Sequence, residues 1–259
     1  MATKETIKRD LGALGLPSAA IVLIHSSLSS LGWVDGGAET VVDAFLDHLG
    51  PAGTLVVPTL PFRGSQFDYL QSDPLFDPDT TPSFMGRVTE SVRLRPGARR
   101  SWHPSHSVSA IGPAAPMLTA PQSHDPWLTF GPESPFGRLL TADGWICLLG
   151  VTHRSSTFLH AVEEQNCLDY FVWPEPLTAR VLRDGEVQHI RTSVGRPGVR
   201  RAFDQIEPLL LAEHALIVGK VGAATVRLMR ARAVMTIATA ALRQRPHLLL
   251  AEPWGPALK

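Results

Sequence analysis

Two short apolar segments with an amphipathic segment between them constrain the fold of this sequence most. The first spans 20–24 and the second 53–58. Strands that are apolar at nearly every position, not at alternate positions, are typical of a parallel sheet covered on both faces. Between them, 38–49 has apolar side chains at helical spacing and ends at Gly50-Pro51. This strand–helix–strand order predicts a right-handed crossover, and with it an α/β fold.

The rest of the chain continues in the same way, without a repeat or a linker. We therefore predict a single domain over 1–259, with a central, mostly parallel sheet flanked by helices and a β-hairpin excursion. Further strands are expected at 107–111, 145–151 and 247–250, a hairpin at 178–192 with Asp184-Gly185 as its turn, and helices at 3–14, 83–94, 156–164, 204–213, 223–230 and 234–243.

Charge and hydropathy exclude several classes of partner. The chain has 24 Lys+Arg and 24 Asp+Glu, a formal net charge of +0, which argues against broad binding to nucleic acid or to an anionic membrane. Its longest apolar runs fall far short of the ~20 residues that span a bilayer. The N-terminal residues lack the pattern of a signal peptide. We expect a soluble cytoplasmic protein.

Common sequence motifs for phosphate loops, dinucleotide binding, serine hydrolases and zinc proteases are missing. Cys147 and Cys167 are too few for a disulfide framework or a four-cysteine zinc site. His103 and His106 have a metal-ligand spacing, but Pro104 lies between them and no third ligand is obvious. We expect no bound metal.

Polar side chains directly follow the first predicted strand. His25, Ser26 and Ser27 end this strand, and Gly36-Gly37 precede the next helix. Hydroxyl groups at a strand end, near a glycine-led helix start, suit the binding of an anion. An ordinary strand–loop–helix connection has the same pattern, so this segment is a candidate site only.

Histidine is concentrated in the middle of the chain, where five of the ten fall within 103–160. On a helix over 156–164, His160 and Glu163 are i, i+3 neighbours on one face. A carboxylate that orients an imidazole is a common way to make a general base. Surface His–Glu pairs have the same spacing, so catalysis by this pair is one of two interpretations.

An ordered series of short motifs runs through nearly the whole chain. It comprises His25-Ser26-Ser27-Leu28, Gly32-Trp33-Val34, Gly36-Gly37, Gly53 to Thr59, Phe76-Asp77-Pro78, Thr81-Pro82, Met85-Gly86-Arg87-Val88, Pro96-Gly97, Arg100-Ser101, His103-Pro104, Ser107, Gly112, Ser134-Pro135, Leu148 to Val151, Thr157, Leu159-His160, Glu163 and, more weakly, Val221-Gly222 and Arg230-Ala231-Arg232. In this series the chain resembles the aminoglycoside 3-N-acetyltransferases, the antibiotic acetyltransferase family that uses acetyl-CoA.

The resemblance implies a single α/β domain, distinct from the GNAT acetyltransferase fold, and transfer of an acetyl group from acetyl-CoA to an amine. It implies that His160 is the general base and that Glu163 is its partner. The residues that it implies for the CoA cleft are His25, Ser26, Ser27, Leu28, Trp33, Gly36, Gly37, His103 and Ser107.

The implied acceptor is a small-molecule amine, an aminoglycoside by resemblance. Aminoglycosides are polycations, so their sites need carboxylates. The proline-rich segment 59–82 carries Asp68, Asp77 and Asp79, and we expect these to face a cationic ligand.

Alternatives to this function stay open: acetylation of a different biosynthetic amine, or a CoA-binding protein without transfer activity. The segment 192–203 lacks carboxylates, and Arg196, Arg200 and Arg201 are suited to a phosphate or a carboxylate, on CoA or on an acidic amine. Because both cysteines lack basic neighbours, we expect direct transfer rather than an acetyl-enzyme. A homodimer is an open alternative to a monomer.

Overall fold

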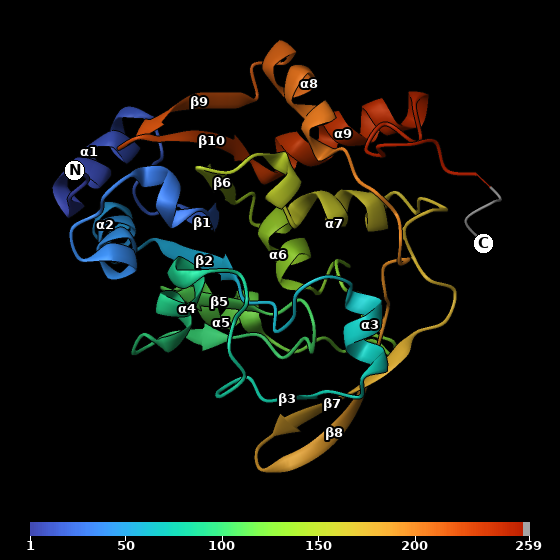
Figure 1. Cartoon of the computed structure of the whole chain (residues 1–259). Coiled ribbons are helices and arrows are strands. Elements are labelled where there is room, and N and C mark those ends of the chain that lie inside the picture. The colour runs from blue at the N-terminus through green and yellow to red at the C-terminus, as the bar shows by residue number, and fades with distance from the viewer. Residues whose placement is uncertain (256–259) are drawn as a thin grey trace.

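A seven-stranded sheet forms the centre of the structure, a computed structural model in which residues 1–255 are described (Figure 1). The last four residues of the predicted domain 1–259 lie outside the described residues. The strands, in their order across the sheet, are β4 (Arg99–Arg100), β5 (Val108–Ile111), β2 (Thr54–Pro58), β1 (Ile21–Ser26), β6 (Trp145–Leu149), β10 (Ala224–Arg230) and β9 (Leu216–Val221).

The three central strands β2, β1 and β6 are parallel. On one side β5 and β4 continue the sheet with antiparallel pairings, and on the other side β10 and β9 do the same. Five of the seven strands therefore point in one direction, and the predicted mostly parallel central sheet is confirmed.

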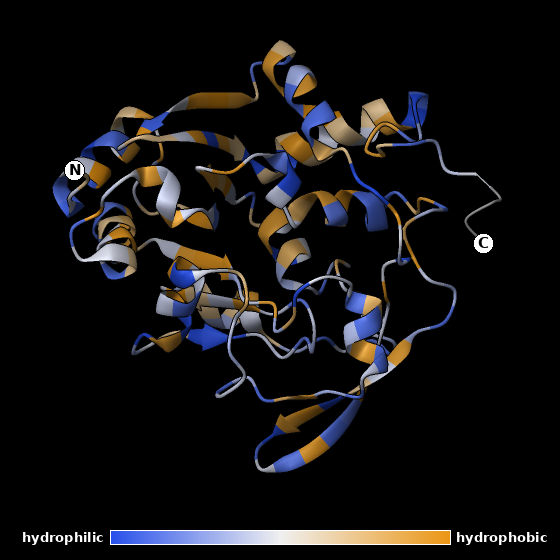
Figure 2. Cartoon of the chain, viewed as in Figure 1, coloured by the Kyte–Doolittle hydropathy of each residue, from blue (hydrophilic) through white to orange (hydrophobic). Residues whose placement is uncertain are grey.

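Both faces of the sheet are buried, as the apolar strands predict. Along β1, Val22 and Ile24 belong to the core on one face, while Leu23 belongs to the core on the other. Each such side chain contributes ~1.5–3 kcal/mol by leaving water. Figure 2 shows the central strands as largely hydrophobic. Helices α1 (Lys4–Ala13), α2 (Gly37–Leu49) and α4 (Arg87–Leu94) cover one face, and α5 (Ala115–Thr119), α6 (Pro135–Thr141), α7 (Phe158–Gln165), α8 (Glu207–Ala212) and α9 (Ala231–Gln244) cover the other.

A smaller sheet projects from the lower edge of the molecule in Figure 1. The strands β7 (Leu177–Arg183) and β8 (Glu186–Thr192) form the predicted hairpin, and β3 (Leu75–Phe76) pairs with β7. Asp184 and Gly185 have φ values of 52° and 82°, and positive φ at both central residues is what a type I′ hairpin turn requires. The short helix α3 (Gln66–Gln71) lies between this sheet and the main domain.

Three predicted elements are wrong or shifted. Residues 224–230 of the predicted helix 223–230 form strand β10 instead, because their backbone pairs with β6 and β9, and a short apolar-rich segment fits either period. The predicted strand at 247–250 is a turn, with one isolated bridge at Leu250. The predicted helix at 83–94 begins only at Arg87, after Gly86 with φ of 111°. Strand β9 has no counterpart among the predicted elements.

Among the helices of residues 1–255, none combines the length and the hydrophobicity needed to traverse a bilayer.

Candidate active site

A cavity of about 590 Å³ lies at the carboxyl ends of the three parallel strands. His25 and Ser26 reach it from β1, Pro58 from β2 and Val151 from the segment after β6. This is the edge at which open α/β sheets bind ligands, because the loops that leave parallel strands diverge there. The opposite wall comes from residues 64–66 and 195–201. The cavity is the best candidate for an active site.

The predicted His–Glu pair lies in this cavity. His160 Nδ1 is 2.6 Å from Glu163 Oε2 on α7, and the His160 ring lines the cavity. The Glu163 side chain is fully buried, and its second oxygen is 3.3 Å from Nε of Arg201. Because Nδ1–H donates to the carboxylate, the lone pair of the neutral ring is on Nε2. The pair therefore has the arrangement of a general base.

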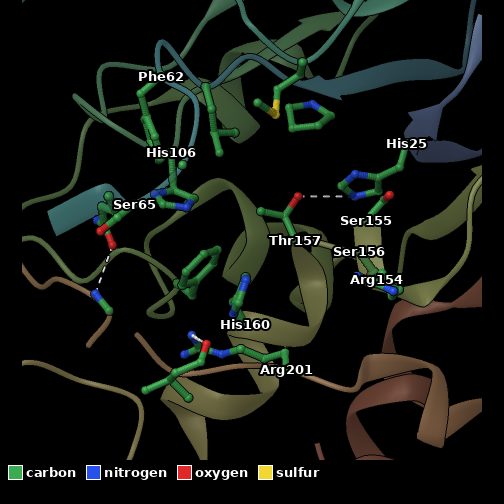
Figure 3. Close-up of a pocket in the computed structure, with 18 of the residues that line it drawn as sticks. His25, Phe62, Ser65, His106, Arg154, Ser155, Ser156, Thr157, His160 and Arg201 are labelled. Atoms are coloured by element: carbon green, nitrogen blue, oxygen red, sulfur yellow. Dashed lines mark hydrogen bonds between the residues drawn. The ribbon is translucent and has the colours of Figure 1, made fainter. Parts of the chain in front are cut away.

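Aromatic rings hold the imidazole of His160 in place. The ring of Phe171 stacks on it with centroids 5.8 Å apart, Phe203 meets it edge-on at 4.9 Å, and Phe130 lies 5.6 Å away. These contacts restrict rotation of the ring about its side-chain bonds. Figure 3 shows the His160 ring among the other lining side chains, above Arg201.

The other two histidines that line the cavity, His25 and His106, are neutral. Burial lowers the pKa of His25 to about 3, and its Nε2 is 3.4 Å from Oγ1 of Thr157 (Figure 3). Burial also holds the pKa of His106 well below its usual range, with smaller contributions from His103 and His160. Among the histidines that line the cavity in the described chain, only His160 contacts a carboxylate.

The residues implied for CoA are only partly brought together. His25 and Ser26 line the cavity, but Ser27 and Leu28, which follow them in the chain, do not. The backbone N–H of Ser27 donates to Leu149 in the sheet, so it is not available to a ligand. Trp33 is 76% exposed and lies outside the cavity. Leu28, Gly36 and Gly37 are also absent from its walls, in the 3-10 turn after β1 and at the start of α2.

His103 and Ser107 do not line the cleft, in contrast to the implied arrangement, because both are fully used in the protein interior. The ring of His103 accepts a hydrogen bond from the N–H of His106 and bonds to Thr192 Oγ1 at 2.9 Å. Ser107 donates to the carbonyl of Thr59 at 2.8 Å. His103 and Ser107 therefore lie behind the cavity wall. His106 lines the cavity itself, although sequence analysis noted it only for its metal-ligand spacing from His103.

The three aspartates expected to face a cationic ligand do not line the cavity either. Asp68 is exposed on α3, and Asp79 is exposed in the following loop. The carboxylate of Asp77 accepts the N–H of Asp79 at 2.9 Å and the hydroxyl of Thr80, so it closes its own turn. These three carboxylates therefore face solvent or stabilise a local turn.

Two polar side chains to which sequence analysis assigned no role, Gln66 and Arg100, hold segments next to the cavity in place. Gln66 accepts the N–H of Gly195 at 2.9 Å and donates to Ser105 at 3.0 Å, which ties α3 to the segment 195–201. Arg100 donates to the carbonyl of Thr59 at 2.6 Å and to that of Thr81, and burial lowers its pKa to about 10. No local pattern identifies either residue, because each acts on a distant segment.

Within residues 1–255, no three His, Cys, Asp or Glu side chains come together in a way that would hold a metal ion. The fold and the site together define an α/β protein of enzyme type, with a His–Glu pair in a cavity at the strand ends, where the imidazole faces the cavity and the carboxylate is buried.

The chain belongs to the aminoglycoside 3-N-acetyltransferase family, whose model matches residues 23–243. It is 33% identical to aminoglycoside N(3)-acetyltransferase IX of Micromonospora chalcea, over 91% of this chain and 92% of that protein. It is 32% identical to the aminoglycoside N(3')-acetyltransferase-like protein YokD of Bacillus subtilis, over 87% of each.

Solved structures of the family agree with this assignment. AAC(3)-IVa, crystallised as a mutant in complex with a gentamicin, superposes with a TM-score of 0.83 at 28% identity, over 98% of this chain and 93% of that one. AAC-IIIb, solved as a binary complex with CoASH, superposes with a TM-score of 0.82 at 25% identity, over 98% and 99%. The resemblance predicted from the sequence motifs is confirmed.

Proposed function

We propose that this protein transfers the acetyl group of acetyl-CoA directly to an amine of a small molecule, with His160 as the general base. The contact of 2.6 Å between His160 and buried Glu163, in a cavity at the strand ends, carries the proposal. The names of the relatives supply the donor and the acceptor class, and an aminoglycoside 3-amino group is the first acceptor to test.

In the proposed step, the amine nitrogen attacks the acetyl carbonyl carbon. A C–N bond forms, the C–S bond breaks, and the sulfur leaves as the thiol of CoA after it takes up a proton. Nε2 of His160 accepts the proton that the nitrogen loses, and Glu163 places its negative charge beside the ring that has become positive. Arg201 holds the other oxygen of Glu163, which keeps the carboxylate in this orientation.

Neither cysteine is placed to carry the acetyl group. Cys147 is fully buried in β6, and burial raises its pKa to about 12, so its thiolate is suppressed. Cys167 is exposed, but it does not line the cavity. The geometry therefore supports transfer between two bound substrates over an acetyl-enzyme.

The strand-end wall suits CoA. His25 and Ser26 offer polar side chains there, and the exposed guanidinium of Arg154 has no ion pair within the described residues. A phosphate of CoA is the kind of group that such an arginine binds. We assign this wall to the acetyl donor and the loop wall at 195–201 to the acceptor.

A thiol-release assay with acetyl-CoA tests the proposal, with gentamicin, apramycin, sisomicin and small primary amines as acceptors. We expect turnover with at least one amine, and we expect His160→Ala to lower kcat by ~10²–10⁴ with little change in the dissociation constant of CoA. His124→Ala is the matched control, because His124 forms an exposed pair with Glu133 at 3.1 Å. If His160→Ala keeps wild-type turnover, the assignment of the base is wrong. If CoA binds but no amine is acetylated, a CoA-binding protein without transfer activity is favoured.

A second acceptor class, an amine other than an aminoglycoside, is favoured by the charge of the cavity. Arg154, Arg196 and Arg201 line it, whereas none of its described lining residues is Asp or Glu.

A further inference from the structure

The charged side chains around the cavity all have the same sign. Its charged lining residues are Arg154, Arg196 and Arg201, and no lining residue of the described chain carries a carboxylate. Glu163, the nearest acidic group to the base, is fully buried behind His160 and is already contacted by Arg201. A polycationic acceptor would therefore meet repulsion without a free counter-charge on these walls.

Arg196 stands out among these arginines because it combines a buried guanidinium N–H that lacks a partner with the absence of an ion pair within the described residues. Its Nε is buried without a hydrogen-bond partner, and no carboxylate of residues 1–255 forms an ion pair with it. Its neighbours in sequence differ: Arg200 pairs with Glu252 at 2.9 Å, and Arg201 pairs with Glu163 at 3.3 Å. A buried donor that no protein group satisfies costs free energy, which a ligand acceptor can recover.

The surroundings of Arg196 hold its guanidinium ready for a ligand. The group lies 5.9 Å from the ring of Trp173 and 5.7 Å from that of Trp254. These two indole rings restrict the planar group and shield it from water, and both effects strengthen a hydrogen bond to an anion. The backbone N–H of Arg196 donates to Phe171 at 2.7 Å, and the Phe171 ring stacks on His160. Arg196 is thereby tied to the wall that holds the base.

The position of Arg196 separates it from the wall that we assign to CoA. In Figure 3, His25, Ser155 and Arg154 lie on one side of His160, and Ser65 lies on the other. The backbone N–H of Gly195 donates to the side chain of Gln66, which follows Ser65 in the chain. Gly195, the residue before Arg196, therefore lies on the same side as Ser65. Arg196 therefore follows a residue of the second side, whereas Arg154 lies on the first.

We infer that the acceptor of this enzyme is a small amine that also carries an oxyanion, a carboxylate or a phosphate, and that Arg196 binds that group. This inference rests on the proposed function. The planar fork of the guanidinium can donate two hydrogen bonds to such a group. With its anion held there, the amine of a small molecule can meet Nε2 of His160 inside a cavity of about 590 Å³.

Binding to the enzyme saturated with CoA tests the inference without requiring turnover. Two matched pairs of probes differ only in the anionic group: glucosamine 6-phosphate against glucosamine, and 4-aminobutanoate against 4-aminobutanamide. We expect calorimetry to show at least one anionic member binding about tenfold or more tightly than its neutral partner, and more tightly than gentamicin. Arg196→Ala should remove this preference, while Arg200→Ala, the exposed arginine of the same segment, should keep it.

Two further measurements separate the sources of the anion and the two proposals. If Arg196 binds CoA instead, Arg196→Ala will raise the KM for acetyl-CoA and leave the preference between the paired probes unchanged, which overturns the inference. Equal or undetectable binding within both pairs, or tighter binding of gentamicin, overturns it as well. Failure of the proposed function is distinct, because it would appear as absence of acetyl transfer or of CoA binding, whatever the paired probes do.

Discussion

Replacement of Glu163 by glutamine tests how the catalytic pair works, because it removes a charge and keeps the shape. In the wild type, a fully buried carboxylate oxygen accepts Nδ1–H of His160 at 2.6 Å. A hydrogen bond with one charged partner contributes ~1.5–3 kcal/mol, and a neutral one ~0.5–1.5 kcal/mol. The midpoints of these ranges differ by roughly 1.3 kcal/mol, which corresponds to a factor of about ten in rate if the difference is expressed in the transition state, where the ring becomes positive. We therefore expect Glu163→Gln to lower kcat about tenfold, and Glu163→Leu to lower it further.

Steady-state thiol release gives kcat and KM for these variants, and thermal unfolding confirms that each is folded at the assay temperature. Arg201 loses its charged partner in both variants, so the melting temperature should fall in both, while only the glutamine can still accept Nδ1–H. Glu133→Gln, in the exposed pair with His124, is the control and should change neither quantity. The reasoning is refuted if Glu163→Gln costs as much as His160→Ala, or if Glu163→Leu retains the activity of the glutamine variant.

Three further outcomes follow from the site and its supports. The double variant Cys147→Ser/Cys167→Ser should stay active wherever it folds, and double-reciprocal plots should intersect; parallel plots with a trapped acetyl-cysteine would contradict direct transfer. Arg100→Met should lower the free energy of unfolding by ~1–3 kcal/mol and raise the KM for the amine, because the 59–82 segment loses its hydrogen bonds to this side chain; unchanged urea midpoints would contradict this role. Burial lowers the pKa of His25 and of His103 to about 3, so each ring takes up a proton more readily in the unfolded chain than in the folded one. The free energy of unfolding should therefore be highest above pH 6.5 and should fall as the pH drops toward 3, by ~1.4 kcal/mol per pH unit for each ring. Urea unfolding at pH 5 and pH 7 measures this slope, and His103→Gln should reduce it.

Local pattern in the sequence accounts for the parts of the fold that depend on neighbours along the chain. The central strands are apolar on both faces, and His160 and Glu163 lie one helical turn apart, so both were predictable. The segment at 224–230 was not, because its strand form depends on pairing with β6 and β9 rather than on its own period.

The walls of the site depend on distant contacts, which no local pattern reveals. Arg201 reaches Glu163 across 38 positions, and Gln66 reaches Gly195 across 129. The aspartates at 68–79 were expected at the cavity because of their charge alone. The path of that segment is instead set by Arg100, whose guanidinium holds the carbonyl groups at 59 and 81.

The general base stands on a packed helix, whereas the acceptor wall is a loop. The reaction and the choice of acceptor therefore depend on different parts of the structure. His160 stands on α7, whose Phe158, Leu159 and Val162 are fully buried in the core, so its position is set by packing that a change of substrate would not touch. Arg196 stands on a loop that Gln66 holds through a few polar contacts, and its charge makes no ion pair within the described chain. A positively or a negatively charged side chain at position 196 is therefore compatible with the same placement of His160 on α7. Membership of the family thus indicates the reaction more strongly than the acceptor, and the charge of the loop wall is the feature of this chain that bears on the acceptor.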